Sequence, residues 1–175
     1  MPRSPTDLVL TKQGVRFHNR LIPCSIGRGG ISGDKREGDG ATPIGTFALR
    51  QLFYRPDRVE PPTSGLPVRA LTPGDGWCDD PAHRDYNQLV ALPFEASHEV
   101  LWREDALYDL IVVIGHNDDP PRPGLGSAIF IHCATADFAP TQGCVALDRE
   151  TLAGLVPRLA PGMALRVNEG QAPPP

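Results

Sequence analysis

A cysteine and a histidine near the C-terminal third of the chain have the clearest potential for chemistry. Cys144 closes the segment Thr141–Cys144, of sequence Thr-Gln-Gly-Cys. His132 ends the short apolar segment Ser127–His132. A thiol is mostly protonated at neutral pH, and a neighbouring imidazole that accepts its proton generates the thiolate, which is the nucleophile. The sequence therefore predicts a Cys–His pair with Cys144 as nucleophile and His132 as base.

Side-chain alternation along a strand separates Cys144 from the other nearby thiol, Cys133. If Ser127–His132 is a strand, successive side chains point to opposite faces, so Cys133 cannot easily share the face of His132. Cys144 arrives by a returning turn and can approach that face. We therefore interpret Cys133 as a core thiol. We also expect His132 to lower the pKa of Cys144 below the ordinary thiol value of about 8.5.

The turn before Cys144 supplies further candidates for the site. Gly143 lets the backbone approach a substrate carbonyl closely. The backbone N–H groups of Gly143 and Cys144 are candidate donors to an oxyanion. We assign Thr141 and Gln142 to substrate binding, and for the Thr141 hydroxyl a turn-stabilising role is an equal alternative.

A second histidine competes for the role of base. His116 follows the apolar run Leu110–Ile114, and adjacent strands can bring two strand-end histidines into one cleft. His132 is favoured as base because it lies closer to Cys144 in the sequence. We assign His116 and the following Asn117 to substrate binding.

These residues resemble the L,D-transpeptidase catalytic domain, a family that cross-links or trims peptidoglycan stem peptides through an acyl-thioester on a cysteine. The resemblance rests on a strand-borne His132 followed by Thr-x-Gly-Cys. It rests also on Gly38–Phe47, whose Thr-Pro-Ile-Gly-Thr-Phe sequence is similar to an earlier signature of that domain. It extends over roughly residues 8–168. The resemblance implies a Cys-nucleophile acyltransferase without a cofactor, a role in cell-wall biogenesis, and stem peptides as partners.

Two positions depart from the commoner pattern of that family. Gln142 stands where many members have His, and Ala146 stands where many have an Arg associated with binding substrate carboxylates. The Cys–His pair is intact. The exact stem peptide, the acceptor amine and the balance between transpeptidase and L,D-carboxypeptidase activity stay open.

Two alternative functions belong to other classes. A metal-dependent peptidase or amidase would use His116, Asp118 and His132 as zinc ligands, although the sequence has no H-E-x-x-H motif. A catalytically silent wall-binding module is favoured by the presence of Gln142 and Ala146. Metal analysis would identify the first alternative and thiol reactivity would exclude the second.

Composition predicts one mainly β domain. The 175 residues suit a single domain at 1–175, with a core at about 8–168. The 18 Gly and 20 Pro imply short elements joined by many turns, which favours a mixed, β-sandwich-like fold with short helices. The expected strands lie at 6–10, 14–17, 19–26, 44–54, 110–116, 127–132 and 163–167.

Other segments are expected to be irregular or helical. Segments 27–41, 55–76 and 117–126 read as loops, and segment 95–109 mixes helix and turn signals. Asp148 is a good N-cap for a short helix that Pro157 limits. We expect the tail at 171–175 to be disordered.

Charge and apolar patterning restrict the partners. The net charge of −4 and the lack of a Lys/Arg cluster argue against nucleic acid. The longest apolar run, Leu110–Ile114, is too short to span a bilayer. No signal peptide is visible in the first seven residues, whereas the resemblance implies a periplasmic or cell-wall-facing location. We expect a monomer.

Overall fold

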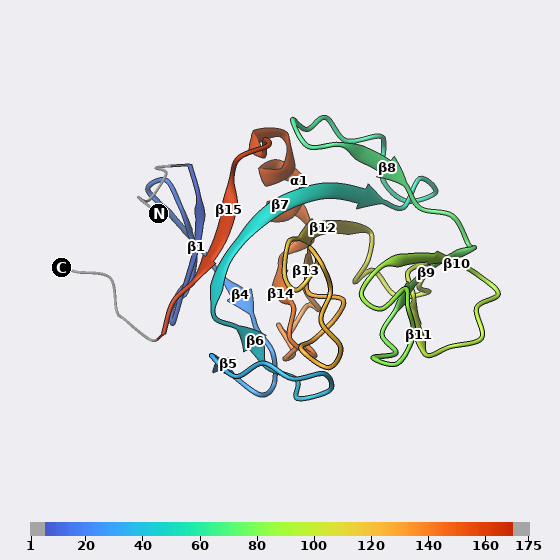
Figure 1. The fold of residues 1–175 in the computed structure, drawn as a ribbon. Helices are drawn as coiled ribbons and strands as arrows, with labels where there is room; N and C mark the ends of the chain where they lie inside the picture. Colours follow the sequence, from blue (N-terminus) through green and yellow to red (C-terminus); the bar gives the residue numbers. More distant parts are fainter. Residues whose placement is uncertain (1–5, 170–175) are drawn as a thin grey trace.

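A computed structural model describes residues 6–169. A large curved mixed sheet dominates it, and β7 runs as a long arc through this sheet (Figure 1). In order across the sheet, the strands are β3 (Arg20–Ile22), β2 (Gly14–Phe17), β1 (Leu8–Thr11), β15 (Ala164–Val167), β7 (Gly45–Tyr54), β12 (Leu110–Ile114), β13 (Phe130–Cys133), β14 (Val145–Leu147) and β4 (Cys24–Ser25), with β8 (Val68–Ala70) also pairing with β7. The expected mainly β fold is confirmed.

Two smaller sheets flank the large one. The first contains β10 (Leu89–Ala91), β9 (Asp75–Cys78) and β11 (His98–Val100), which lie together at one side of the molecule (Figure 1). The second pairs β5 (Ile31–Ser32) with β6 (Thr42–Pro43). Parts of the segments expected to be loops therefore form strands. Segment 95–109, which carried mixed signals, contains β11 and no helix among the described residues.

The centre of the large sheet is buried on both faces. All five residues of β12 are buried, as its continuous apolar sequence predicts. Leu110, Val112 and Ile114 belong to one core cluster together with Leu152 of α1 (Arg149–Leu155). The alternate residues of β12 belong to a second cluster, in which the side chains of the β9–β11 sheet pack. The central strands are thus enclosed between a helical layer and a small sheet.

The ends of several elements follow from local chemistry. The Asp148 carboxylate accepts a hydrogen bond from the Thr151 N–H at 3.0 Å, which confirms the predicted N-cap of α1. Pro157 lies in the short 3-10 helix η1 (Val156–Arg158), where the α-helix has ended. The strand expected at 127–132 is observed as β13, which begins at Phe130. Ala128 has a positive φ of 53°, so the backbone leaves the strand conformation there.

Two expectations from the sequence concern the ends of the chain and the membrane. The tail at 171–175 lies outside the described residues. Within 6–169, the structure contains no helix of the length and hydrophobicity that a membrane span requires.

Candidate active site

Cys144 and His132 line one cavity of about 550 Å³. Strands β13 and β14 pair in parallel, with His132 opposite Ala146. Because side chains alternate along each strand, Phe130 and His132 on β13 lie on the same face as Cys144 and Ala146. The two residues that sequence spacing paired are therefore brought to one cavity.

Cys133 is also among the residues that line this cavity, but its side chain belongs to the core on the opposite face of β13. It is 1% exposed and belongs to the core cluster that contains the α1 side chains, whereas Cys144 belongs to the cluster on the other face. Burial raises the pKa of the Cys133 thiol to about 11. The expectation that strand alternation makes Cys133 a core thiol is confirmed.

A backbone carbonyl orients the His132 ring. The Nδ1 atom lies 2.8 Å from the carbonyl oxygen of Cys133. A carbonyl only accepts hydrogen bonds, so Nδ1 carries the proton in the neutral ring and Nε2 is left as the basic nitrogen. The His132 and Tyr108 rings pack in a T-shaped arrangement, with ring centroids 5.3 Å apart. Burial lowers the pKa of His132 to about 4, and the positive charge of Arg103 contributes in the same direction.

The Cys144 thiol is held as a neutral group. Its Sγ donates to the carbonyl oxygen of Ala128 at 3.2 Å and accepts from the N–H of Phe130 at 3.3 Å. Burial raises the pKa of the thiol to about 12, and the negative charge of Glu99 adds to this rise. The expectation of a lowered Cys144 pKa is therefore wrong. Burial thus favours the neutral thiol and the neutral imidazole in this cavity, because removal from water disfavours both charged forms.

The Thr141 hydroxyl stabilises the turn that carries Cys144. It donates to the Cys144 carbonyl at 2.6 Å and accepts from the Gly143 N–H at 3.1 Å. The Gly143 amide is thus directed into the turn, and the Cys144 amide is the remaining candidate of the two predicted oxyanion donors. Thr141, Gln142 and Ala146 line the cavity, whereas Gly143 does not.

Gly143 is needed where two loops approach each other. Its φ is +130°, and an added Cβ would lie 2.8 Å from the carbonyl oxygen of Ala41. The next residue, Thr42, begins β6 and is 1% exposed. Its hydroxyl donates to the Gly143 carbonyl at 2.8 Å and accepts from the Gly27 N–H at 2.9 Å. The Thr-Pro-Ile-Gly segment therefore supports the Cys144 turn from behind.

Thr42 gives a direct test of this support. Thr42→Val keeps the shape of the side chain but leaves the Gly27 N–H and the Gly143 carbonyl buried without this partner. We expect it to lower the free energy of unfolding by about 2 kcal/mol and to slow acylation of Cys144. Thr42→Ser keeps the hydroxyl and is the matched control. Urea unfolding and acylation rates check this, and equal behaviour of the two variants would contradict the assignment.

His116 and Asn117 lie outside the cavity. Strands β12 and β13 are antiparallel, so the residues that follow β12 lie beside the start of β13, away from His132. His116 Nε2 bonds to the Leu125 carbonyl at 3.0 Å. The Asn117 amide nitrogen donates to the carbonyls of Arg122 and Gly126, each at 3.0 Å. Both side chains hold loop 117–126, and the expectation of two histidines in one cleft is corrected by the strand direction.

The predicted zinc ligands are also kept apart by this arrangement. His116 is bound to loop 117–126 and Asp118 pairs with Arg50 at 2.8 Å, while His132 faces the cavity. In the part of the chain that the structure describes, no group of three or more His, Cys, Asp or Glu side chains is arranged to hold a metal ion. The alternative of a metal-dependent peptidase receives no support from the positions of these three residues.

Asn87 positions the acceptor of the Cys144 thiol, a role that the sequence did not reveal. It is buried and has a positive φ of 58°. Its Oδ1 accepts from Trp77 Nε1 at 2.9 Å and from the Ala128 N–H at 3.0 Å. Its amide nitrogen donates to the carbonyls of His116 and Asn117. Asn87 therefore fixes Ala128, whose carbonyl receives the thiol hydrogen bond.

Charged residues from the β9–β11 region also line the cavity and were not predicted. They include Asp79, Glu99 and Arg103, together with the ring of Tyr108. Lys35 and Glu37 approach from the loop between β5 and β6. The signals in segment 95–109 were too mixed to place these side chains.

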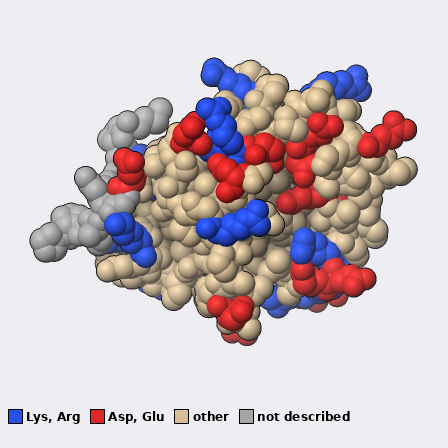
Figure 2. Space-filling model, turned by 90° about the horizontal axis from the view of Figure 1, so that it is seen from below, with Lys and Arg blue, Asp and Glu red and all other residues tan. Residues whose placement is uncertain are grey.

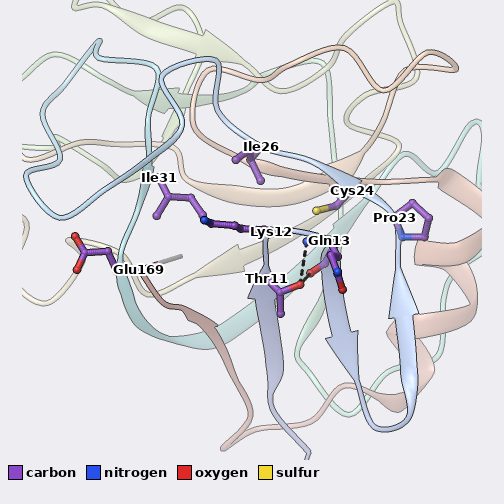
Figure 3. A pocket seen from close by; sticks show the side chains of 9 residues that line it. Thr11, Lys12, Gln13, Pro23, Cys24, Ile26, Ile31 and Glu169 are labelled. Carbon is purple, nitrogen blue, oxygen red and sulfur yellow. Dashed lines mark hydrogen bonds between the residues drawn. The ribbon is translucent and has the colours of Figure 1, made fainter. Parts of the chain in front are cut away.

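A separate cavity of about 540 Å³ contains another thiol (Figure 3). It lies between the β1–β2 turn and the β4–β5 region, and Cys24, Ile26 and Ile31 are among its lining residues. Burial raises the pKa of Cys24 to about 11. In the described part of the chain no histidine lines this cavity. Cys24 thus provides an internal comparison for the reactivity of Cys144.

The sequence matches the family model for YkuD, the L,D-transpeptidase catalytic domain, over residues 4–167. No curated protein and no solved structure matches the chain. The matched range contains the Cys144 turn, the His132 strand and the Thr42 segment that supports them. The chain therefore belongs to the YkuD family of L,D-transpeptidase catalytic domains.

Proposed function

We propose that the protein is an L,D-transpeptidase that acylates Cys144 with a peptidoglycan stem peptide. The family membership supports action on peptidoglycan. The observation that carries the specific proposal is that Cys144 shares a cavity with His132, whose Nδ1 is fixed by a carbonyl so that Nε2 is the basic nitrogen. A periplasmic or cell-wall-facing location and action as a monomer belong to the same proposal.

The proposed reaction begins with proton transfer. As the Cys144 sulfur attacks the carbonyl carbon of a meso-diaminopimelate-type residue, in the amide that joins it to the terminal D-Ala, the thiol proton passes to His132 Nε2. The sulfur–carbon bond forms and the carbonyl oxygen becomes an oxyanion, for which the Cys144 amide is the candidate donor. The bond to the terminal D-Ala then breaks, and His132 returns the proton to the leaving amine.

The second half of the reaction releases the acyl group. An acceptor amine attacks the thioester carbonyl, His132 takes a proton from that amine, and the sulfur–carbon bond breaks. The proton returns to the sulfur, which regenerates the Cys144 thiol and leaves a new amide cross-link. If water attacks in place of the amine, the product is a shortened stem peptide, and the activity is that of an L,D-carboxypeptidase.

Purified muropeptides with tetrapeptide stems test this proposal. The wild-type protein is expected to release D-Ala and to give either cross-linked dimers or tripeptide stems, which mass spectrometry distinguishes. Unchanged muropeptides after prolonged incubation, with the protein folded, would leave the silent wall-binding alternative as the better account.

The pH dependence of the acylation step follows from the burial of His132. Its pKa is lowered to about 4, so the ring is neutral and able to accept a proton at every pH above that value. We therefore expect the acylation rate to fall on acidification near pH 4, whereas an ordinary histidine would give a fall near 6.5. Single-turnover rates of D-Ala release between pH 3.5 and 8 measure this. A fall centred at 6.5 would contradict a buried neutral base.

A further inference from the structure

Glu99 is a charged residue of the cavity that contacts His132 through one intervening side chain. It lies in β11 and lines the cavity. Its Oε2 accepts from the Tyr108 hydroxyl at 2.7 Å, and the Tyr108 ring packs against His132 in a T-shaped arrangement. The charge of Glu99 raises the pKa of Cys144. A single side chain thus separates this carboxylate from the imidazole.

The carboxylates of the cavity are bound by hydroxyl groups. Those of Glu37, Asp79 and Glu99 line it, and within the described residues none of the three forms an ion pair. The hydroxyl donors are those of Tyr86 and Ser127 to Glu37, of Ser97 to Asp79, and of Tyr108 to Glu99. In the described part of the chain no cation forms an ion pair with any of the three. Burial raises the pKa of Glu99, and the nearby charge of Arg103 acts against that effect.

The two cations that line the cavity have carboxylate partners of their own. Lys35 pairs with Asp39, and Arg103 pairs with Asp105 at 2.6 Å. On the face seen in Figure 2, Asp and Glu side chains gather together with Lys and Arg beside them. Because both cavity cations are already paired, the groups that are left to attract a charged ligand are carboxylates, and they favour a cation.

Among the three carboxylates, Glu99 is the one placed to discriminate between substrates. Glu37 is held by two hydroxyl donors and Asp79 by the hydroxyl of Ser97. Burial raises the pKa of Glu99, and the charges of Asp79 and Glu37 contribute in the same direction. A cation beside Glu99 would stabilise the buried carboxylate. It would also weaken the electrostatic repulsion between Glu99 and a thiolate at Cys144.

We propose that Glu99 receives the ammonium group of a diamino-acid side chain in the stem peptide, and so selects the stem peptides that acylate Cys144. The inference rests on the proposed function and assigns a specificity-determining residue to it. The ligand is a primary ammonium on a flexible aliphatic chain. It binds the Glu99 carboxylate when the backbone carbonyl of the same diamino acid lies at Cys144 Sγ.

Two synthetic tetrapeptides that differ by one amine test the assignment. One carries Lys at the third position, and the other carries norleucine, which lacks the ammonium. The wild-type protein is expected to acylate with the Lys peptide at least about tenfold faster, as kcat/KM for D-Ala release. In Glu99→Gln the rate with the Lys peptide falls relative to the norleucine peptide, and the ratio approaches one. The norleucine rate does not fall, because the charge that raises the pKa of Cys144 is removed. Glu104→Gln, an exposed acid outside the cavity, keeps the wild-type ratio.

The opposite outcomes would overturn the inference. If the ratio of kcat/KM between the Lys and norleucine peptides persists in Glu99→Gln, Glu99 does not bind the ammonium. Equal losses of kcat/KM with both peptides would lead to the same conclusion. Activity with the norleucine peptide serves as the control for folding of the Glu99 variant.

Binding to Cys144→Ala separates this inference from the proposed function. By calorimetry, Cys144→Ala is expected to bind the Lys peptide at least about tenfold more tightly than the norleucine peptide, and Glu99→Gln in that background removes the difference. If this preference is found but the wild-type protein releases no D-Ala, the proposed function fails and the inference stands. If the wild-type protein releases D-Ala equally from both peptides, the proposed function stands and the inference is wrong.

Discussion

Replacing Cys144 by alanine is expected to abolish release of D-Ala from tetrapeptide stems, with a loss of at least about a thousandfold. We do not expect the three other thiols of the described chain to take over the reaction, and Cys78 is buried in β9 and does not line the cavity. Cys133 lies in the core on the opposite face of β13, and Cys24 lies in the separate cavity without a histidine. Steady-state release of D-Ala, followed with equal amounts of folded protein, measures the loss.

Cys133→Ala is the matched control for this substitution. It removes a buried thiol from the end of β13 but leaves Cys144 and His132 in the cavity. We expect it to keep the rate of D-Ala release and to lower the free energy of unfolding by about 1 kcal/mol, because a small cavity is created. Loss of activity in Cys133→Ala with retention in Cys144→Ala would reverse the assignment.

Replacing His132 by alanine is expected to have the second largest effect. The Cys144 thiol has a pKa raised to about 12, so it cannot attack at neutral pH unless a base takes its proton. We expect acylation to slow by about a hundredfold to ten-thousandfold. The residual rate should rise with pH, since hydroxide then replaces the imidazole as the proton acceptor. The wild-type rate should be flat over the same range.

His116→Ala provides the comparison for the histidine assignment. His116 bonds to the Leu125 carbonyl and packs against Phe47, with ring centroids 5.3 Å apart. We expect this variant to loosen loop 117–126 and to slow acylation less than His132→Ala does. Measuring both variants by single-turnover acylation decides between them, and a larger loss in His116→Ala would favour it as the base.

Local rules were sufficient to predict that Cys144 and His132 lie at one cavity. Strand alternation alone places Cys133 on the other face, and the N-cap at Asp148 is set by hydrogen bonding within one turn. The continuous apolar sequence of β12 likewise predicts a strand buried on both faces. Each of these features depends on residues that are close together in the sequence.

Features that depend on how distant elements pair could not be predicted. The position of His116 is decided by the antiparallel register of β12 and β13, which the sequence does not reveal. The raised pKa of Cys144 results from enclosure by the β9–β11 sheet and from the charge of Glu99. The role of Asn87 depends on its reaching Ala128 across the fold, with a backbone conformation that asparagine adopts more readily than most residues.

The measurement that tests the central claim most directly is the identification of the residue that becomes acylated. The protein is mixed with a tetrapeptide stem, quenched in acid within the first turnover, and examined by intact mass and peptide mapping. The account predicts a single adduct, the mass of the peptide without D-Ala, as a thioester on Cys144. An adduct on Cys24 or Cys133 in place of Cys144 would contradict it. Full release of D-Ala by Cys144→Ala would also contradict it.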